Sequence, residues 1–255
     1  MNEEDYLPYL LRSIQAQTYE DFEVIVADKF STDDTRKIAE EYNARVIDGG
    51  LVAEGRNWGA KVAKGEILLF LDADVILPDP WFLQTTIAEF EKRALDVATC
   101  KIKPITDKKI DKFMHEFFNY YMWVTSAIRP HAPGFCIFSR KKMHEAVNGF
   151  DEEIKLAEDH DYVQRAGKKG KFGLLKTYRI PVSVRRFDRD GRLNIVVKYL
   201  LCEFHMHTIG VVKSDLFKYS FGYDEESLEQ LKKSGEGRLK KVKKLLSKTI
   251  MKKKK

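Results

Sequence analysis

The chain has 255 residues, of which 44% are hydrophobic and 33% charged, and this balance indicates a soluble, globular protein able to bury a core. The net charge of +6 is unevenly spread. Residues 232–255 hold twelve Lys and Arg against one Glu, a charge of +11, so residues 1–231 carry −5. The three cysteines lack the short spacing of a disulfide framework or a zinc site, which favours a reducing compartment.

No run reaches the roughly 18 apolar residues of a membrane span, since the closest, 193–212, is interrupted by charged and histidine residues. The basic segment is usually solvated charge, but it also suits anionic lipid head groups. A nucleic-acid role is disfavoured, because residues 232–255 contain no aromatic side chain that would stack on bases.

Hydrophobic spacing in the first 100 residues alternates between helical and strand-like segments. Helices are predicted at 7–14, 31–42, 54–63 and 78–93, and strands at 22–27, 45–47, 66–71 and 96–100. This order predicts an α/β fold with a mostly parallel central sheet flanked by helices. Ligands of such sheets bind at the carboxyl ends of the strands.

The second half is less regular. An aromatic-rich helix is predicted at 109–126, a strand at 134–138, a helix from Glu158 through Ala166, and an amphipathic helix at 193–208. We expect the region 191–231 to be a C-terminal amphipathic helical extension and 232–255 to be a basic tail.

Two carboxylates follow the most apolar predicted strand. Asp72 and Asp74 are separated by one residue, and Asp28 closes an earlier strand. Such a pair is common at turns, but after a buried strand it suits a hard divalent cation that also takes diphosphate oxygens. The cation would neutralise charge on a departing nucleotide diphosphate.

A second acidic cluster opens the predicted helix near residue 158. Glu158, Asp159 and Asp161 are acids of the kind that capping and the helix dipole favour. A carboxylate here would equally serve as a general base that takes a proton from an attacking hydroxyl.

These motifs, in this order, resemble those of the family-2 glycosyltransferases. Residues 2–7 (NEEDYL) resemble N-E-E-x-x-L, and 26–35 (VADKFSTDDT) resemble V-V-D-D-G-S-T-D-x-T. Residues 55–60 (GRNWGA) resemble A-R-N-x-G, 63–74 (AKGEILLFLDAD) resemble A-x-G-E…F-L-D-A-D, and 149–161 (GFDEEIKLAEDHD) resemble G-F-D-E…E-D-x-D. The resemblance covers roughly residues 1–187 and implies a GT-A fold over 1–190, with a nucleotide-binding half at 1–100 and an acceptor-side half at 101–190.

The resemblance implies a donor site. Asp28 would contact the base or ribose, Arg56 would lie near the nucleotide, Asp72 would bind the sugar nucleotide, and Asp74 would ligate a divalent metal, Mg²⁺ or Mn²⁺.

It also implies an acceptor side and a reaction. Asp159 would be the general base of an inverting single displacement, with Glu158 and Asp161 beside it and Gly134 where the acceptor and the donor sugar meet. Arg185 and Arg186 lie in a segment that resembles a basic strand-end motif of some members, and they would contact the diphosphate or remain in a solvated loop.

The chain departs from the family at two places. Lys29 and Phe30 replace the frequent Asp-Gly, which affects base preference. The family's first strand, which is central in the sheet, has no counterpart before Asn2, and a central gap would leave buried backbone groups unpaired. We therefore hypothesise that Met1 is an internal methionine of a longer protein, which in-frame upstream codons for an apolar strand would support.

Three functions compete. The leading hypothesis is metal-assisted transfer of a sugar to a hydroxyl acceptor, such as a lipid-linked or cell-surface glycan precursor, by an enzyme at the cytoplasmic face of a membrane. A nucleotidyltransferase would normally need a Gly-rich basic phosphate loop near the N-terminus, and none is present. A non-catalytic nucleotide- or membrane-binding member is favoured by the missing strand and disfavoured by the intact acidic set. His205 and His207 are two residues apart, on different faces of their helix, which argues against a shared metal.

Overall fold

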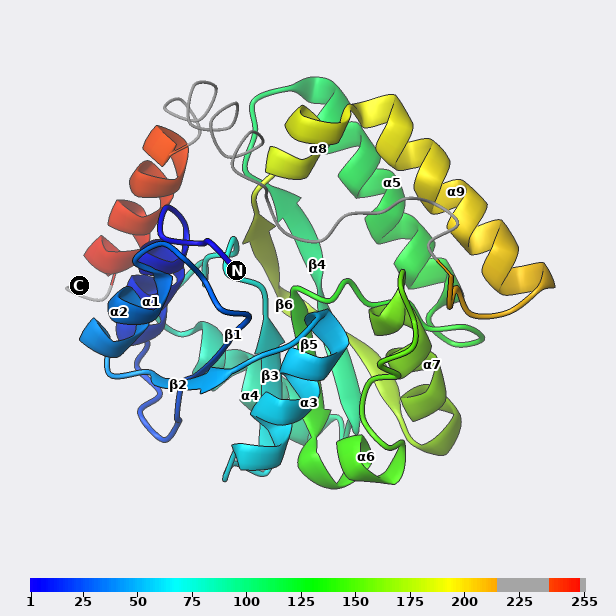
Figure 1. The fold of residues 1–255 in the computed structure, drawn as a ribbon, viewed down its shortest axis with the longest axis horizontal. Helices are drawn as coiled ribbons and strands as arrows, with labels where there is room; N and C mark the ends of the chain where they lie inside the picture. Colours follow the sequence, from blue (N-terminus) through cyan, green and yellow to red (C-terminus); the bar gives the residue numbers. More distant parts are fainter. Residues whose placement is uncertain (215–238, 253–255) are drawn as a thin grey trace.

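The computed structural model describes residues 1–214 and 239–252. Its helices are α1 Leu7–Gln15, α2 Thr35–Glu41, α3 Val52–Val62, α4 Phe82–Lys92, α5 Lys109–Thr125, α6 Lys141–Ala146, α7 Glu158–Lys169, α8 Arg185–Asp190 and α9 Arg192–Thr208. Its strands are β1 Ile25–Asp28, β2 Arg45–Asp48, β3 Ile67–Leu71, β4 Val97–Pro104, β5 Cys136–Arg140 and β6 Phe172–Val182. Each predicted helix and strand up to residue 208 has a counterpart, and α6, β6 and α8 were not predicted. The α/β class is confirmed (Figure 1).

The described strands form two separate sheets. β1 pairs in parallel with β2, and the other sheet has the order β3-β5-β4-β6. Within these sheets, the edges of β1 and β3 that border the cleft have no partner strand. Instead, residues 24–27 and 65–71 both line one large cleft together with apolar side chains of α1. The sheet is therefore divided at the place where the sequence predicts a gap.

The strand directions differ from a mostly parallel sheet. β4 and β6 are parallel, but β5 is inserted between β3 and β4 and runs antiparallel to both. In this register Leu71, the last residue of β3, pairs with Cys136, the first residue of β5. The loop that enters β5 therefore lies at the carboxyl end of β3, next to Asp72.

Aromatic side chains fill both faces of the larger sheet. Phe82 and Phe90 of α4 pack with Phe138 on one face, with ring centroids 6.3 Å from Phe138 in each pair. On the other face, Phe150 stacks on Tyr162 of α7 at 4.1 Å. Because α7 is held by this buried contact, the acids at its first turn have a fixed position.

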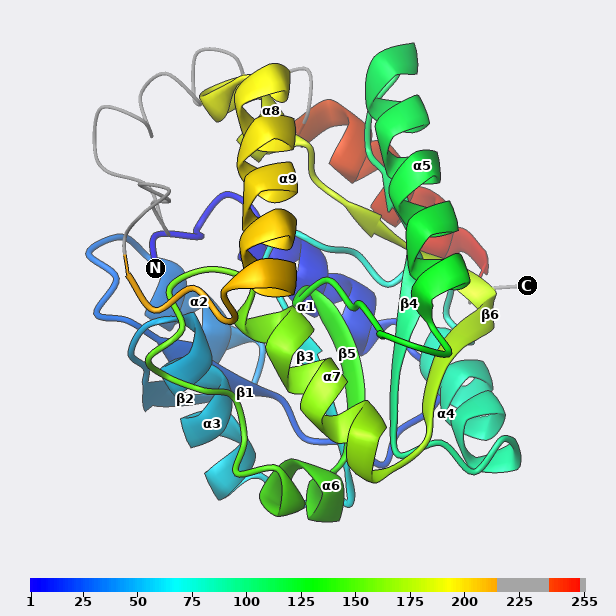
Figure 2. The ribbon, with the colours of Figure 1, turned by 90° about the vertical axis from the view of Figure 1, so that its right-hand side faces the viewer.

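α5 and α9 form the remaining part of the fold and lie side by side (Figures 1 and 2). The guanidinium of Arg192 at the start of α9 forms a salt bridge with buried Asp111 near the start of α5. Further along, Tyr121 of α5 donates a hydrogen bond of 2.8 Å to Glu203 of α9. Large apolar side chains remain exposed on both helices, among them Phe113, Phe117, Trp123, Leu200 and Phe204.

Residues 239–252, which belong to the predicted basic tail, form a helix that packs on the body of the protein. Val242, Leu246 and Thr249 are buried, and Lys252 donates a hydrogen bond of 2.7 Å to Asp79. Residues 239–252 are therefore packed against the protein and are not a fully solvated charged segment. Its exposed side carries the lysines at positions 240, 243, 244 and 248. None of the helices in the described residues is long and apolar enough to cross a membrane.

Candidate active site

The site lies in a cleft of about 1930 Å³ at the carboxyl end of β3. Its polar wall is built from three places in the chain: the residues that follow β3, the loop that enters β5, and the first turn of α7. These segments supply Asp72 and Asp74, Gly134, and Glu158 and Asp159 respectively. The antiparallel insertion of β5 is what brings the second segment to the first.

Arg56 of α3 links two of these segments. Its guanidinium lies 3.1 Å from the carboxylate of Asp72 and 2.8 Å from that of Glu158. The side chain is 10% exposed, and its guanidinium carbon lies 5.2 Å from the ring centroid of Phe150. A buried guanidinium needs such partners, so the end of β3 and the start of α7 are held together through one cation.

Asp159 is oriented by backbone donors. The N–H of Gly134 donates a 2.6 Å hydrogen bond to one of its oxygens, and the N–H of His160 donates a 2.8 Å bond to the other. The carboxylate also lies in the first turn of α7, where the helix dipole favours negative charge. These two donors fix the orientation of the Asp159 carboxylate, as a general base requires.

Glu158 differs from its neighbour. Burial raises the pKa of Glu158 to about 7, the charge of Asp159 adds to the rise, and Arg56 opposes it. Two adjacent carboxyls in one site are therefore in different environments, with Asp159 exposed to the cleft and Glu158 committed to Arg56.

Asp74 is held by a second arginine. Arg185 at the start of α8 donates a 3.0 Å hydrogen bond to Asp74 and bonds of 2.8 and 2.7 Å to the two oxygens of Glu3. Its guanidinium carbon lies 4.5 Å from the ring centroid of Tyr6. Burial raises the pKa of Asp74 from its usual value, although Arg185 opposes the rise.

The donor set fits a hard divalent cation. Asp72 and Asp74 both line the cleft, and each offers carboxylate oxygens, the ligands that Mg²⁺ and Mn²⁺ prefer. Arg56 and Arg185 each take up one of the roughly four lone-pair sites of a carboxylate, so ligand capacity remains. A bound cation would also offset the burial of Asp74.

A family model, that of glycosyl transferase family 2, matches residues 1–147 of the chain. The chain belongs to this family. TarS of Staphylococcus aureus strain Mu50, a poly(ribitol-phosphate) beta-N-acetylglucosaminyltransferase, is 28% identical over 176 residues, which are 65% of this chain and 30% of TarS. A poly(ribitol-phosphate) beta-glucosyltransferase of Bacillus spizizenii is 29% identical over 182 residues, 67% of this chain and 28% of that protein. The chain thus aligns with less than a third of the length of these relatives.

Solved structures have the same fold. The structure of residues 1–349 of S. aureus TarS with UDP-GlcNAc has a TM-score of 0.60 at 20% identity, covering 98% of this chain and 81% of that one. A mannosyltransferase of Pyrobaculum calidifontis in complex with GDP-Man and Mn²⁺ has a TM-score of 0.66 at 16% identity, covering 96% and 71%. The GT-A fold of this glycosyl transferase family 2 member is thereby established.

Two residues expected in the site are not brought into the cleft. Asp28 is 2% exposed, accepts a 2.8 Å hydrogen bond from the N–H of Ser31, and lies 3.6 Å from Arg36. Asp161 forms a 2.7 Å ion pair with Arg165 on α7. Neither is among the residues that line the cleft, whereas Arg186 is.

Polar residues of other family motifs join separate segments, a role that the sequence did not predict. Backbone N–H groups of Asn2 and Glu3 donate to the hydroxyls of Ser31 and Thr35, both at 2.8 Å, so the first motif is tied to the second. The side chain of Asn57 accepts a 2.8 Å bond from the N–H of Phe150 and donates a 2.9 Å bond to its carbonyl. In the sequence, these residues are recognisable as polar residues beside the acidic motifs. Their partners could not be predicted, because Glu3 and Thr35 are 32 positions apart and Asn57 and Phe150 are 93 positions apart.

Substitution of Gly134 tests its packing against the guanidinium of Arg56. A Cβ at this position would collide with the Arg56 guanidinium, so we expect Gly134→Ala to lower the free energy of unfolding by about 1–3 kcal/mol and to weaken nucleotide-sugar binding. The matched control is Gly59→Ala in α3, where an added Cβ meets nothing within 4 Å. It should be neutral or stabilise by up to about 1 kcal/mol. Denaturant unfolding compares the two variants, and donor titration follows Gly134→Ala against the wild type. An equal change in the free energy of unfolding in both variants would refute this packing role.

Proposed function

We propose that this chain carries a glycosyltransferase domain that moves a sugar from a nucleoside-diphosphate sugar to a hydroxyl acceptor with inversion. The observation that carries the proposal is the convergence of Asp72, Asp74 and Asp159 on one cleft around buried Arg56. A donor-side pair of carboxylates and a backbone-oriented base at one site are what a single displacement needs.

In the proposed reaction, the acceptor hydroxyl enters beside Gly134 and attacks the anomeric carbon, and Asp159 takes its proton. The hydrogen bond from the Gly134 N–H keeps the Asp159 carboxylate in place. Arg56 and Arg185 hold Asp72 and Asp74 toward the donor diphosphate, with Arg186 at the same wall of the cleft. A divalent cation on Asp72 and Asp74 would neutralise charge on the leaving nucleotide.

The named relatives indicate which classes of donor and acceptor to expect. The two curated relatives described above are named for transfer to poly(ribitol-phosphate), and the solved structures include complexes with UDP-GlcNAc and GDP-Man. We infer a nucleotide-sugar donor and, as acceptor, a hydroxyl of a cell-surface or lipid-linked glycan precursor.

We further infer attachment to the cytoplasmic face of an anionic membrane. The helix at 239–252 presents four exposed lysines, and α5 and α9 expose a set of apolar side chains that includes Phe113 and Phe204. Basic and apolar groups together are what binding at a lipid surface requires.

A non-catalytic member of the family is the second candidate. The divided sheet favours it, because β1, whose last residue Asp28 is the expected nucleotide contact, pairs with β2 on one edge and borders the cleft on the other. The first two experiments below separate the candidates.

Donor binding should require the cation and Asp74. We expect one class among UDP-, GDP- and dTDP-sugars to stabilise the protein with Mn²⁺, by about 2.7 kcal/mol at a hundredfold excess over Kd, and not with EDTA. Asp74→Asn should abolish the shift. Thermal unfolding measures this, and the absence of a shift with every donor would favour the non-catalytic candidate.

Removal of the base should separate chemistry from binding. We expect Asp159→Asn to lower kcat/KM by about 10²–10⁴-fold, as loss of a general base does, while donor-induced stabilisation is retained. The matched control is Asp107→Asn, an exposed carboxylate outside the cleft lining, which should keep the wild-type rate. Nucleotide release in the presence of acceptor is the measurement, and an unimpaired Asp159→Asn would remove this residue from the mechanism.

Membrane attachment should depend on the exposed lysines. Replacement by Gln at positions 240, 243, 244 and 248 should weaken binding to phosphatidylserine vesicles by about 1 kcal/mol per residue. Because Val242 and Leu246 are buried, these changes leave the docked face intact, unlike deletion of the helix. Four exposed lysines elsewhere, at 37, 61, 92 and 168, provide the charge-matched control. Equal vesicle binding by both quadruple variants would refute the assignment.

A further inference from the structure

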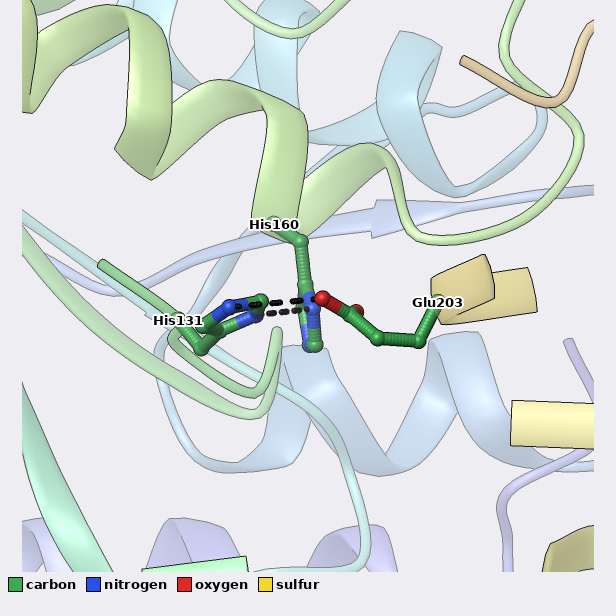
Figure 3. Close-up of side chains that lie close together, drawn as sticks. All are labelled: His131, His160 and Glu203. Carbon is green, nitrogen blue, oxygen red and sulfur yellow. Dashed lines mark hydrogen bonds and ion pairs between the residues drawn. The ribbon is translucent and has the colours of Figure 1, made fainter. Parts of the chain in front are cut away.

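Three side chains outside the carboxylate cluster of the active site converge from separate elements. His131 lies in the loop before β5, His160 is in the first turn of α7, and Glu203 is on α9 (Figure 3). One potential ligand atom from each lies within 4.8 Å of the others. The proposed sugar transfer uses none of these three side chains.

The Nδ1 atoms of the two imidazoles face each other. Nδ1 of His131 lies 2.9 Å from Nδ1 of His160, so in the absence of an ion one of them must carry the proton between them. The Nε2 atoms lie near oxygen groups: that of His131 lies 3.2 Å from the Tyr121 hydroxyl and 3.6 Å from the Glu203 carboxylate, and that of His160 lies 3.9 Å from Asp159. A metal-bound histidine has this arrangement, one ring nitrogen on the ion and the other directed to an outer oxygen.

The cluster is shielded from solvent on the His131 side, since this side chain is fully buried. Glu203 accepts a 2.8 Å hydrogen bond from Tyr121, which orients its carboxylate toward the two rings. Arg129 lies 3.9 Å from this carboxylate, and its charge would oppose a bound cation.

We propose that His131, His160 and Glu203 form a binding site for a divalent transition metal such as Zn²⁺, separate from the pair Asp72 and Asp74. Two imidazole nitrogens and one carboxylate are a ligand set for borderline metals, whereas an all-oxygen set suits Mg²⁺. Tetrahedral zinc with Zn–N bonds of about 2.0–2.1 Å places two nitrogens about 3.4 Å apart, so the rings need to separate by about half an ångström.

His207 is the candidate fourth ligand. It follows Glu203 by four residues on α9, and its Nε2 lies 3.0 Å from the Glu203 carboxylate. Its side chain is 52% exposed and can turn without disturbing the core. The ion would then join α9 to the first turn of α7, one residue from Asp159, and fix the helix that borders the acceptor side of the cleft.

Cobalt and zinc binding test the site without reference to sugar transfer. The experiment uses the full chain carrying Asp74→Asn, so that the donor-side metal site is disabled. We expect one equivalent of Co²⁺ to give the intense visible bands of four-coordinate cobalt, and Zn²⁺ to displace it. Zinc X-ray absorption should show at least two imidazole ligands. Absence of stoichiometric binding, or fewer than two imidazoles, would overturn the proposal.

Ligand substitutions identify the residues. On the same background, His160→Gln and Glu203→Gln should each weaken binding by more than about 100-fold, since loss of an outer-shell partner alone costs about 10–100-fold. His205→Gln is the matched control on α9, because His205 bonds the carbonyl of Gly210 and is not in the cluster. Retention of wild-type affinity in both ligand variants would assign any bound ion elsewhere. If circular dichroism shows either variant to be unfolded, the number of imidazole ligands in the zinc X-ray absorption spectrum of the Asp74→Asn chain tests the proposal instead.

Discussion

The buried guanidinium of Arg56 is the interaction on which the active site depends. A buried cation without a partner costs several kcal/mol, so Asp72 and Glu158 are required as much by folding as by chemistry. The strand end that bears Asp72 and the helix that bears Asp159 are 86 or more residues apart in the sequence, and Arg56 from a third element closes the distance between them. Arg185 does the same for Asp74 and Glu3 at the other side of the cleft. The acidic motifs that contain Glu3, Asp72 with Asp74, and Glu158 are thus each paired with a specific arginine.

The direction of β5 has an equally direct effect on the site. An antiparallel strand between β3 and β4 starts where β3 ends, and so its entering loop is placed beside Asp72. Gly134 lies in that loop and must be glycine-sized to leave room for Arg56 while its N–H reaches Asp159. The antiparallel direction of β5 therefore places at one position both the room for Arg56 and the N–H that donates to Asp159.

Much of this could be predicted from the sequence. The alternation of apolar periods predicted each helix and strand of the first 100 residues, because these elements are amphipathic or fully apolar. β6 was missed because the polar residues Lys176 and Thr177 interrupt its apolar pattern, and the pairing shifts there: Cys100 pairs with Leu175 but Lys101 with Arg179. α6 and α8 have six residues each, too few for a periodic signal.

The candidate site was predicted in its residue types but not in its pairings. Asp72, Asp74, Asp159 and Gly134 are all at the cleft, whereas Asp28 and Asp161 are engaged by Ser31 and Arg165. Strand-end acids look alike in a sequence, and the partner that neutralises each is chosen by long-range packing. The His131 cluster was missed for the same reason, since its members are spread over 72 positions and meet only after α9 lies along α5.

The division of the sheet has a consequence for dynamics. β1, β2 and α2 form a layer whose described strands pair with each other and not with the larger sheet. The cleft lies between this layer and the larger sheet. Such a layer is a natural unit of local opening, with a lower opening free energy than the β3–β6 core. A molecule bound across the cleft would contact both parts and join them into one cooperative unit. Amide hydrogen exchange in β1 and β2 would then report occupancy of the cleft, while the strands of the core would exchange slowly in either state.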